Sequence, residues 1–206
     1  MLRIIIFPFL LLALSCIGQS STHTNFYFPP KSFVTERTYY FVNQNDTAEV
    51  MVWKMKADFS GGDTTLHTSI FNNNGFSESM VERIENENST MLSYILYKGT
   101  SSSICTIIDS SIYKTNQDAT ESIQWKVTFA DFNPPALMSM EKRRKILSSR
   151  EDSVTFFDRI TVAVVGTADK YEYFLESTYK AGIGLVSCKL NVPNRPVKNF
   201  QLMEIE

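Results

Sequence analysis

The sequence is poor in the residues that most enzyme active sites use. It has only 2 histidines and 3 cysteines among 206 residues, so a histidine-based acid–base site or a zinc site has few side chains to draw on. No glycine-rich phosphate loop and no Gly-x-Ser-x-Gly nucleophile elbow is present. We therefore expect a protein that is not an enzyme and that has no metal or other cofactor. Solvated strand faces account for the acidic residues that a catalytic pair would need, namely Glu82, Glu85, Glu87, Asp152, Asp158, Glu172 and Glu176.

The chain also lacks an excess of charge of either sign. Its 20 basic and 22 acidic side chains give a net charge of −2, which provides no electrostatic footprint for nucleic acid. The one dense basic run is Lys142-Arg143-Arg144-Lys145. We interpret this run as a solvated helix face, with contact to anionic lipid headgroups or an acidic partner as the alternative. We expect no nucleic-acid partner.

Long apolar runs are absent except at the N-terminus. Arg3 precedes the mainly apolar stretch 4–14, and polar residues follow from Gln19. A bilayer-spanning helix needs about 20 apolar residues, so this shorter stretch is typical of a secretory signal peptide. The sequence predicts a signal peptide at 1–18, a tether at 19–32 and a single β-rich domain at 33–206. We expect export to the periplasm, the outer-membrane surface or the extracellular space, with no membrane span after processing.

The few cysteines have alternative interpretations. Ala13-Leu14-Ser15-Cys16 partly matches the bacterial lipoprotein box, which makes Cys16 a candidate for a lipid anchor. Otherwise Cys16 is removed with the signal peptide. Cys105 and Cys188 remain as an even pair in an exported chain, which is compatible with a disulfide. Two buried free thiols are the alternative for this pair.

Aromatic residues are abundant, with 15 Phe and 9 Tyr, and they favour strands over helices. Segments 48–59 and 121–129 alternate between apolar and polar residues, as expected for strands with one dry and one wet face. Segment 91–97 is apolar on both faces, which predicts a strand covered on both sides. Clusters of Asn, Gly and Asp separate these runs and are typical of tight turns. The pattern predicts an antiparallel meander.

One segment, 133–147, favours a helix. Asn133 is a suitable N-cap, Pro134 suits the first helical position, and most of the following residues are helix formers. Continuation of a strand is the alternative. The predicted fold class is therefore mainly β: a single curved antiparallel sheet, arranged as a meander in an open half-barrel, with one or two short helices.

Three motifs together resemble a known group of proteins. Tyr27-Phe28-Pro29-Pro30-Lys31 opens the domain, Tyr179-Lys180-Ala181-Gly182-Ile183-Gly184-Leu185-Val186 lies near its end, and segment 200–205 closes it. They resemble uncharacterised bacterial envelope proteins and lipoproteins, which are similar to the half-barrel fold of the lipoprotein-localisation carrier. Ala181 departs from the group, where Lys-Gly is commoner. The resemblance implies the fold and, by analogy alone, an apolar ligand or an envelope protein partner; it implies no catalytic residues.

Two hypotheses for function follow. In the first, the inner face of the sheet binds or carries a lipid-like or other apolar ligand. In the second, the protein is a structural or interaction module of a cell-surface complex, with a filled interior and an exposed apolar patch or strand edge. Ordinary core packing is the alternative explanation for the candidate ligand-lining residues, which are Met51, Trp53, Met55, Leu92, Tyr94, Leu96, Trp125 and Phe129.

Overall fold

The protein folds as a β-sheet structure. Its computed structural model describes residues 33–60, 64–73, 76–85, 88–98, 101–109, 112–114, 119–127 and 136–206. Within these ranges the regular elements are strands, and no α-helix occurs. The strands are β1 (Arg37–Asn43), β2 (Asp46–Asp58), β3 (Thr65–Asn72), β4 (Phe76–Glu85), β5 (Asn88–Lys98), β6 (Ser101–Asp109), β7 (Ile112–Lys114), β8 (Ala119–Val127), β9 (Ala136–Ser149), β10 (Ser153–Val164), β11 (Lys170–Lys180), β12 (Gly184–Asn191) and β13 (Lys198–Ile205).

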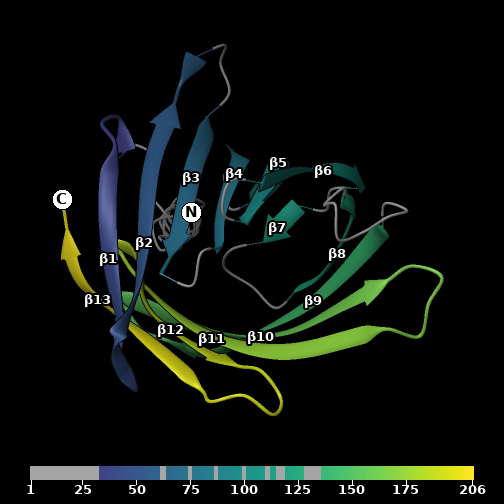
Figure 1. Cartoon of the computed structure of the whole chain (residues 1–206). Helices are drawn as coiled ribbons and strands as arrows, with labels where there is room; N and C mark the ends of the chain where they lie inside the picture. Colours follow the sequence, from purple (N-terminus) through teal and green to yellow (C-terminus); the bar gives the residue numbers. More distant parts are fainter. Residues whose placement is uncertain are drawn as a thin grey trace, which may run out of the picture.

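These strands form one antiparallel sheet. Its strand order is β4-β3-β2-β1-β13-β12-β11-β10-β9-β8-β6-β5-β7, and a further pairing joins β4 to β5. Strands that follow one another in the chain are neighbours along most of this order, so the predicted meander is confirmed. Figure 1 shows the sheet curving from β2 and β3 past β13 and β12 to the long strands β10 and β11. The predicted fold class, a mainly β protein with a single curved antiparallel sheet, is confirmed.

The first and last strands are neighbours. The backbone amide of Thr38 donates to the carbonyl of Glu206, and the amide of Glu206 donates to the carbonyl of Thr38, both at 2.9 Å. Figure 1 shows the C-terminus beside β1. Strand β1 therefore depends on the most distant part of the sequence for one of its two partners.

The glycine-containing motif near the C-terminus forms the turn between β11 and β12. Gly182 and Gly184 have φ angles of 73° and 94°, in the region that side chains with a Cβ rarely adopt. The amide of Ile183 donates to the carbonyl of Lys180 at 3.1 Å, which closes the turn. The spacing of these glycines is therefore explained by backbone geometry, and the sheet passes directly from β11 into β12.

The apolar core lies on the inner face, where strands β1–β3 meet strands β10–β13. Phe33, which precedes β1, is fully buried, and its ring lies 6.0 Å from the ring of Tyr39. The row continues from Tyr39 to Phe41 at 6.4 Å and from Phe41 to Trp53 at 5.6 Å, measured between ring centroids. Every second residue of each strand contributes, because strand side chains alternate between the two faces. The same cluster contains Met51, Met55, Leu66, Ile70, Val154, Phe156, Tyr179, Leu185 and Phe200.

The helix predicted over 133–147 is wrong in the part of it that the structure describes. Residues Ala136–Ser149 form strand β9, which pairs with β8 on one side and β10 on the other. Two ladders of backbone hydrogen bonds outweigh the modest helix preference of Lys, Arg, Met and Leu, because intrinsic propensity is a weak term beside tertiary pairing. The strand alternative is therefore the one that the structure adopts. Asn133 and Pro134, the predicted start of the helix, lie outside the described residues.

Candidate functional site

A buried ion pair lies on the inner face of β9 and β10. Arg144 and Asp158 are direct cross-strand partners. The Nε atom of Arg144 donates to Oδ1 of Asp158 and Nη2 donates to Oδ2, both at 2.7 Å, which is the two-point geometry that a guanidinium and a carboxylate favour. Their side chains are only 6% and 1% exposed. The guanidinium also lies 4.4 Å from the centre of the Phe156 ring, so both partners are fixed in place.

Strand β4 brings carboxylates to the inner face as well. Glu78 and Glu82 lie on the same face of this strand as Met80 and Ile84, which pack against the core. Glu82 is buried. Burial raises the pKa of Glu78, while a hydrogen bond from the Tyr94 hydroxyl to Glu78 Oε2, 2.9 Å long, opposes that rise. Glu78 is therefore a carboxyl group whose protonated form is favoured by its surroundings.

Curvature of the sheet brings Glu78 of β4 close to Tyr173 of β11, although these two strands are not paired. Burial raises the pKa of Tyr173 on β11 to about 12, and the charges of Glu78 on β4 and Asp158 on β10 raise it further. Burial likewise raises the pKa of Tyr179, and the positive charge of Arg144 works against that rise. We call this set the inner polar cluster; its members are Glu78, Glu82, Tyr94, Lys142, Arg144, Asp158 and Tyr173.

Apolar side chains continue the inner face beyond the charged ones. Met140 pairs with Val162, and Met138 pairs with Val164, in the same β9–β10 register that places Arg144 opposite Asp158. All four of these side chains are half-buried, whereas Lys142 and Ile160, the next pair towards Arg144, are buried. We call Met138, Met140, Val162 and Val164 the apolar rim. The inner face of these two strands therefore passes from half-buried apolar groups to buried charged groups.

The basic run 142–145 does not form the solvated helix face that the sequence predicts. Lys142 and Arg144 are each 7% exposed, while Arg143 and Lys145 are exposed on the other face of β9. The alternation of Met138 and Met140 with Ser139 and Glu141 was the available signal, because it places Lys142 and Arg144 on the methionine face.

The acidic residues need a similar correction. Glu82 and Asp158 are 5% and 1% exposed rather than on solvated faces. Asp158 lies between Phe156 and Ile160 in the same alternating series of β10, and that pattern indicated its face. A buried carboxylate is tolerated where a cation and hydrogen bonds compensate its loss of hydration.

The structure places the candidate ligand-lining residues in different surroundings. Met51 and Met55 of β2 are 8% and 1% exposed in the packed core, with Trp53 packed against it. Tyr94 belongs to the inner polar cluster, and Leu92 is 42% exposed. Leu96 lies on β5 and Trp125 on β8, opposite Met138, but their side chains are outside the described part, as is the whole of Phe129.

The predicted disulfide is not formed in this structure. Cys188 on β12 is a free, buried thiol, and burial raises its pKa to about 12. Cys105 lies on β6, and strands β8, β9, β10 and β11 stand between β6 and β12 in the strand order. The side chain of Cys105 and the whole of Cys16 are outside the described residues. The cysteine that the structure describes is thus an ordinary core residue.

The described ranges contain no group of three or more His, Cys, Asp or Glu side chains placed to hold a metal ion. No helical segment with the length and hydropathy needed to cross a membrane occurs in them either. The inner polar cluster contains hydrogen-bond donors, on Lys142, Arg144 and the tyrosines, and acceptors, on the two glutamates, and within it Arg144 pairs with Asp158 and Tyr94 pairs with Glu78.

Fold and site together define a class: a mainly β protein with one curved antiparallel sheet whose inner face carries both apolar and charged side chains. No protein-family model matches the sequence, and no curated protein matches it. Two solved structures share the fold. One is a candidate lipoprotein from Parabacteroides distasonis, with a TM-score of 0.55 and 10% identity over 88% of this chain and 99% of that chain.

The second solved structure is a candidate exported protein with a YmcC-like fold from Bacteroides fragilis. Its TM-score is 0.51, with 12% identity over 88% of this chain and 99% of that chain. At such low identity the likeness shows the fold alone. The predicted resemblance to bacterial envelope proteins and lipoproteins is consistent with these neighbours, whereas neither structure is described as a lipoprotein-localisation carrier.

Proposed function

We propose that the protein is an exported, non-catalytic binding protein of the bacterial cell envelope that holds an amphiphilic ligand on the inner face of its sheet. The observation that carries the proposal is the succession of side chains along β9 and β10. Half-buried apolar residues of the rim lead directly to the buried charged residues of the inner polar cluster. An apolar chain would contact the rim while its polar group lies beside Tyr173, a half-buried member of the inner polar cluster that pairs with Ile160 on the same face as Val162. Ligand sites are generally mainly apolar with a few placed polar groups.

The packed side of the inner face offers less room for a ligand. Phe33, Met55 and Leu66 are at most 1% exposed there, so their surfaces are already covered by other protein atoms. The ligand therefore uses the apolar rim on β9 and β10 rather than the Met51–Met55 side of β2. Trp125 remains a candidate lining residue, because its strand register places it opposite Met138.

Export is the second part of this proposal. It is supported by the predicted signal peptide at 1–18 and by a fold shared with proteins described as a candidate lipoprotein and a candidate exported protein. The intact mass of the protein from its native envelope distinguishes the two processing routes. A chain that begins at Cys16 with added acyl mass indicates a lipid anchor, and a chain that begins near Gln19 without it indicates simple cleavage. A mass that still includes residues 1–15 contradicts export with processing.

Ligand binding is tested by native mass spectrometry of protein from its own envelope and by titration with a fluorescent fatty acid. Val162→Lys places a charge within the apolar rim, and we expect it to weaken fatty-acid binding by about tenfold or more. Thr161→Lys, on the other face of β10, is the matched control and should bind as the unmodified protein does. A ligand-free mass together with no fatty-acid binding contradicts the proposal, as does equal weakening by both variants at unchanged melting temperature.

A second candidate function is favoured by exposed apolar side chains outside the rim. Met203 of β13 is 62% exposed, Phe71 of β3 is 45% exposed, and Ile205 of β13 is 38% exposed. Such residues suit an interaction module of a cell-surface complex. A ligand-free native mass combined with cross-linking of residues near Met203 to one envelope protein would favour this function over ligand binding.

A further inference from the structure

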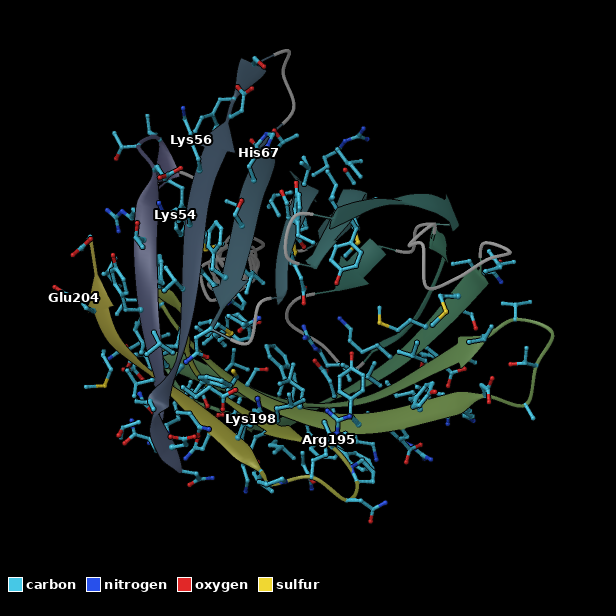
Figure 2. All side chains as sticks on the ribbon, viewed as in Figure 1. Lys54, Lys56, His67, Arg195, Lys198 and Glu204 are labelled. Atoms are coloured by element: carbon cyan, nitrogen blue, oxygen red, sulfur yellow. The ribbon has the colours of Figure 1, made fainter. Side chains whose placement is uncertain are left out.

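A pocket of about 560 Å³ lies at strands β2 and β3, and most of the residues that line it are exposed, in contrast to the buried inner polar cluster. Exposed side chains of Lys54 and Lys56 on β2 and of His67 on β3 line it, together with the half-buried Ser69. Figure 2 shows the two lysines and His67 on these adjacent strands.

Strand register sets these four residues at the corners of a small rectangle. Lys56 is the direct partner of His67, and Lys54 is the direct partner of Ser69. Neighbouring strands lie about 4.8 Å apart, and residues i and i+2 about 7 Å apart, so all four side chains can reach one small group above the sheet. Each of these side chains can donate a hydrogen bond, two of them as permanent cations.

The two lysines are available to an external anion. Among the described residues no ion pair uses Lys54 or Lys56. Asp58, an acidic residue in the lining, is occupied by a local turn, because the Ser60 amide and hydroxyl donate to its two oxygens at 2.8 and 3.0 Å. Glu36 is the other carboxylate of the lining, and among the described residues no salt bridge joins either carboxylate to a lysine. The Ser60 hydrogen bonds lower the pKa of Asp58 most, and the charges of His67 and Lys56 lower it further.

We infer that this pocket binds a phosphate group carried by a larger organic molecule. A phosphate presents three or more acceptor oxygens to the four donors, whereas a carboxylate presents two, and lysine is a common phosphate ligand. The volume is in the range of about 300–1,000 Å³ that whole organic ligands occupy, which is more than phosphate alone requires.

The phosphate lies on the Lys54–Ser69 side, because Asp58 and the 43%-exposed ring of Phe59 line the other end. The part of the ligand near Asp58 and Glu36 is therefore neutral or cationic. Phospholipid headgroups and soluble organophosphates share this chemistry.

The test uses the purified protein and three probes: inorganic phosphate, glycerol 3-phosphate, and vesicles of neutral lipid with and without an anionic phospholipid. We expect glycerol 3-phosphate to bind more tightly than inorganic phosphate. The double variant Lys54→Gln/Lys56→Gln should weaken binding by at least about tenfold, since it removes both fixed charges. The matched control is Lys170→Gln/Lys189→Gln, which removes the same charge from exposed positions elsewhere and should bind like the unmodified protein.

The outcomes separate the two sources of phosphate. Vesicle binding that glycerol 3-phosphate inhibits, and that only the pocket variant loses, identifies a lipid headgroup. Glycerol 3-phosphate binding without vesicle binding identifies a soluble organophosphate. No binding of any probe overturns the inference, and so does equal weakening by the pocket and control variants. Circular dichroism melting of each variant verifies that the folded sheet is intact, and Ser69→Ala gives a milder pocket variant should the double variant fail to fold.

Discussion

The two sides of the inner face show how the same strand geometry accommodates opposite chemistry. On β1–β3 the inward positions hold Phe41, Met55 and Leu66, which need only close packing. On β9 and β10 the inward positions hold Arg144 and Asp158, which are equally buried but compensate each other's charge. Burial on this sheet is thus determined by position in the alternation rather than by residue type. The first region supplies apolar packing, and the second adds the polar groups that the proposed function uses.

The largest expected effect comes from breaking the buried ion pair. Arg144→Ala leaves the carboxylate of Asp158 buried without its cation, so we expect the free energy of unfolding to fall by about 3–5 kcal/mol. Urea denaturation measures this change. Arg159, which follows Asp158 on β10, pairs with Glu172 at 2.6 Å in an exposed setting, and Arg159→Ala should cost only about 0–1 kcal/mol.

A double variant tests the same buried ion pair by removing both of its charges. Arg144→Met/Asp158→Leu removes both charges and should recover much of the loss, because a well-packed apolar pair often replaces a buried ion pair. An Arg144→Ala protein as stable as Arg159→Ala would mean that the pair lies in contact with water, which contradicts its burial.

The packed side of the inner face is tested at Phe33 and its neighbour in sequence. Phe33→Ala removes a fully buried ring that stacks on Tyr39, and we expect a loss of about 3 kcal/mol. Val34 is 62% exposed, so Val34→Ala should change stability by no more than about 0.5 kcal/mol. Equal effects at the two positions would show that the segment before β1 does not pack against the sheet. Thermal unfolding followed by circular dichroism is sufficient to compare them.

A smaller, pH-dependent effect is expected at Glu78. Because burial raises the pKa of its carboxyl group, the folded protein holds this proton more firmly than the unfolded chain does. The group's contribution to stability is fully present below the ordinary glutamate pKa and is lost as the pH rises through the raised value. Glu78→Gln removes this dependence, so its stability relative to the unmodified protein should increase from pH 4 to pH 8. Tyr94 and Tyr173 face the same carboxyl group, and Tyr173, whose pKa is raised to about 12, remains neutral over this range.

The control for this measurement is Glu176→Gln, which removes a charge from an exposed position of β11. A constant difference between Glu78→Gln and the unmodified protein across this range would contradict a raised pKa at Glu78.

The smallest expected effect concerns the chemical reactivity of the Cys188 thiol and involves no loss of stability. At pH 8 a thiol with a pKa of about 12 is ionised in about one molecule in 10⁴, so Cys188 should resist a thiol-specific reagent in the folded protein. After denaturation without reductant, Cys105 and Cys188 should both react within minutes. A denatured, unreduced protein with no reactive thiol would instead reveal a disulfide between them.

Local alternation predicted much of the fold. The alternating segment 48–59 corresponds to β2 (Asp46–Asp58), and segment 121–129 overlaps β8 (Ala119–Val127). The Asn- and Asp-rich stretch 43–46 lies at the turn between β1 and β2. These features depend on the neighbouring residues in the chain, which a single sequence contains.

The candidate site could not be predicted in the same way. Glu78 and Tyr173 belong to β4 and β11, which are not paired strands, so their proximity arises from the curvature of the whole sheet. The charged residues of β9 favoured a helix by composition, and only pairing with β8 and β10 determines which of them face inward. Sequence patterns identify strands more readily than the distant residues that a curved sheet brings together.

The pairing of Thr38 with Glu206 has a consequence for how the chain is made. A ribosome releases β1 well before β13, so one edge of β1 has no permanent partner until the last residues appear. Contacts across such a separation make folding slow, and an unpaired strand edge attracts other chains in the meantime. Nascent chains should therefore depend on holding chaperones until synthesis ends. A stalled chain that lacks β13 should be captured by a holding chaperone, whereas the completed chain should fold and escape it.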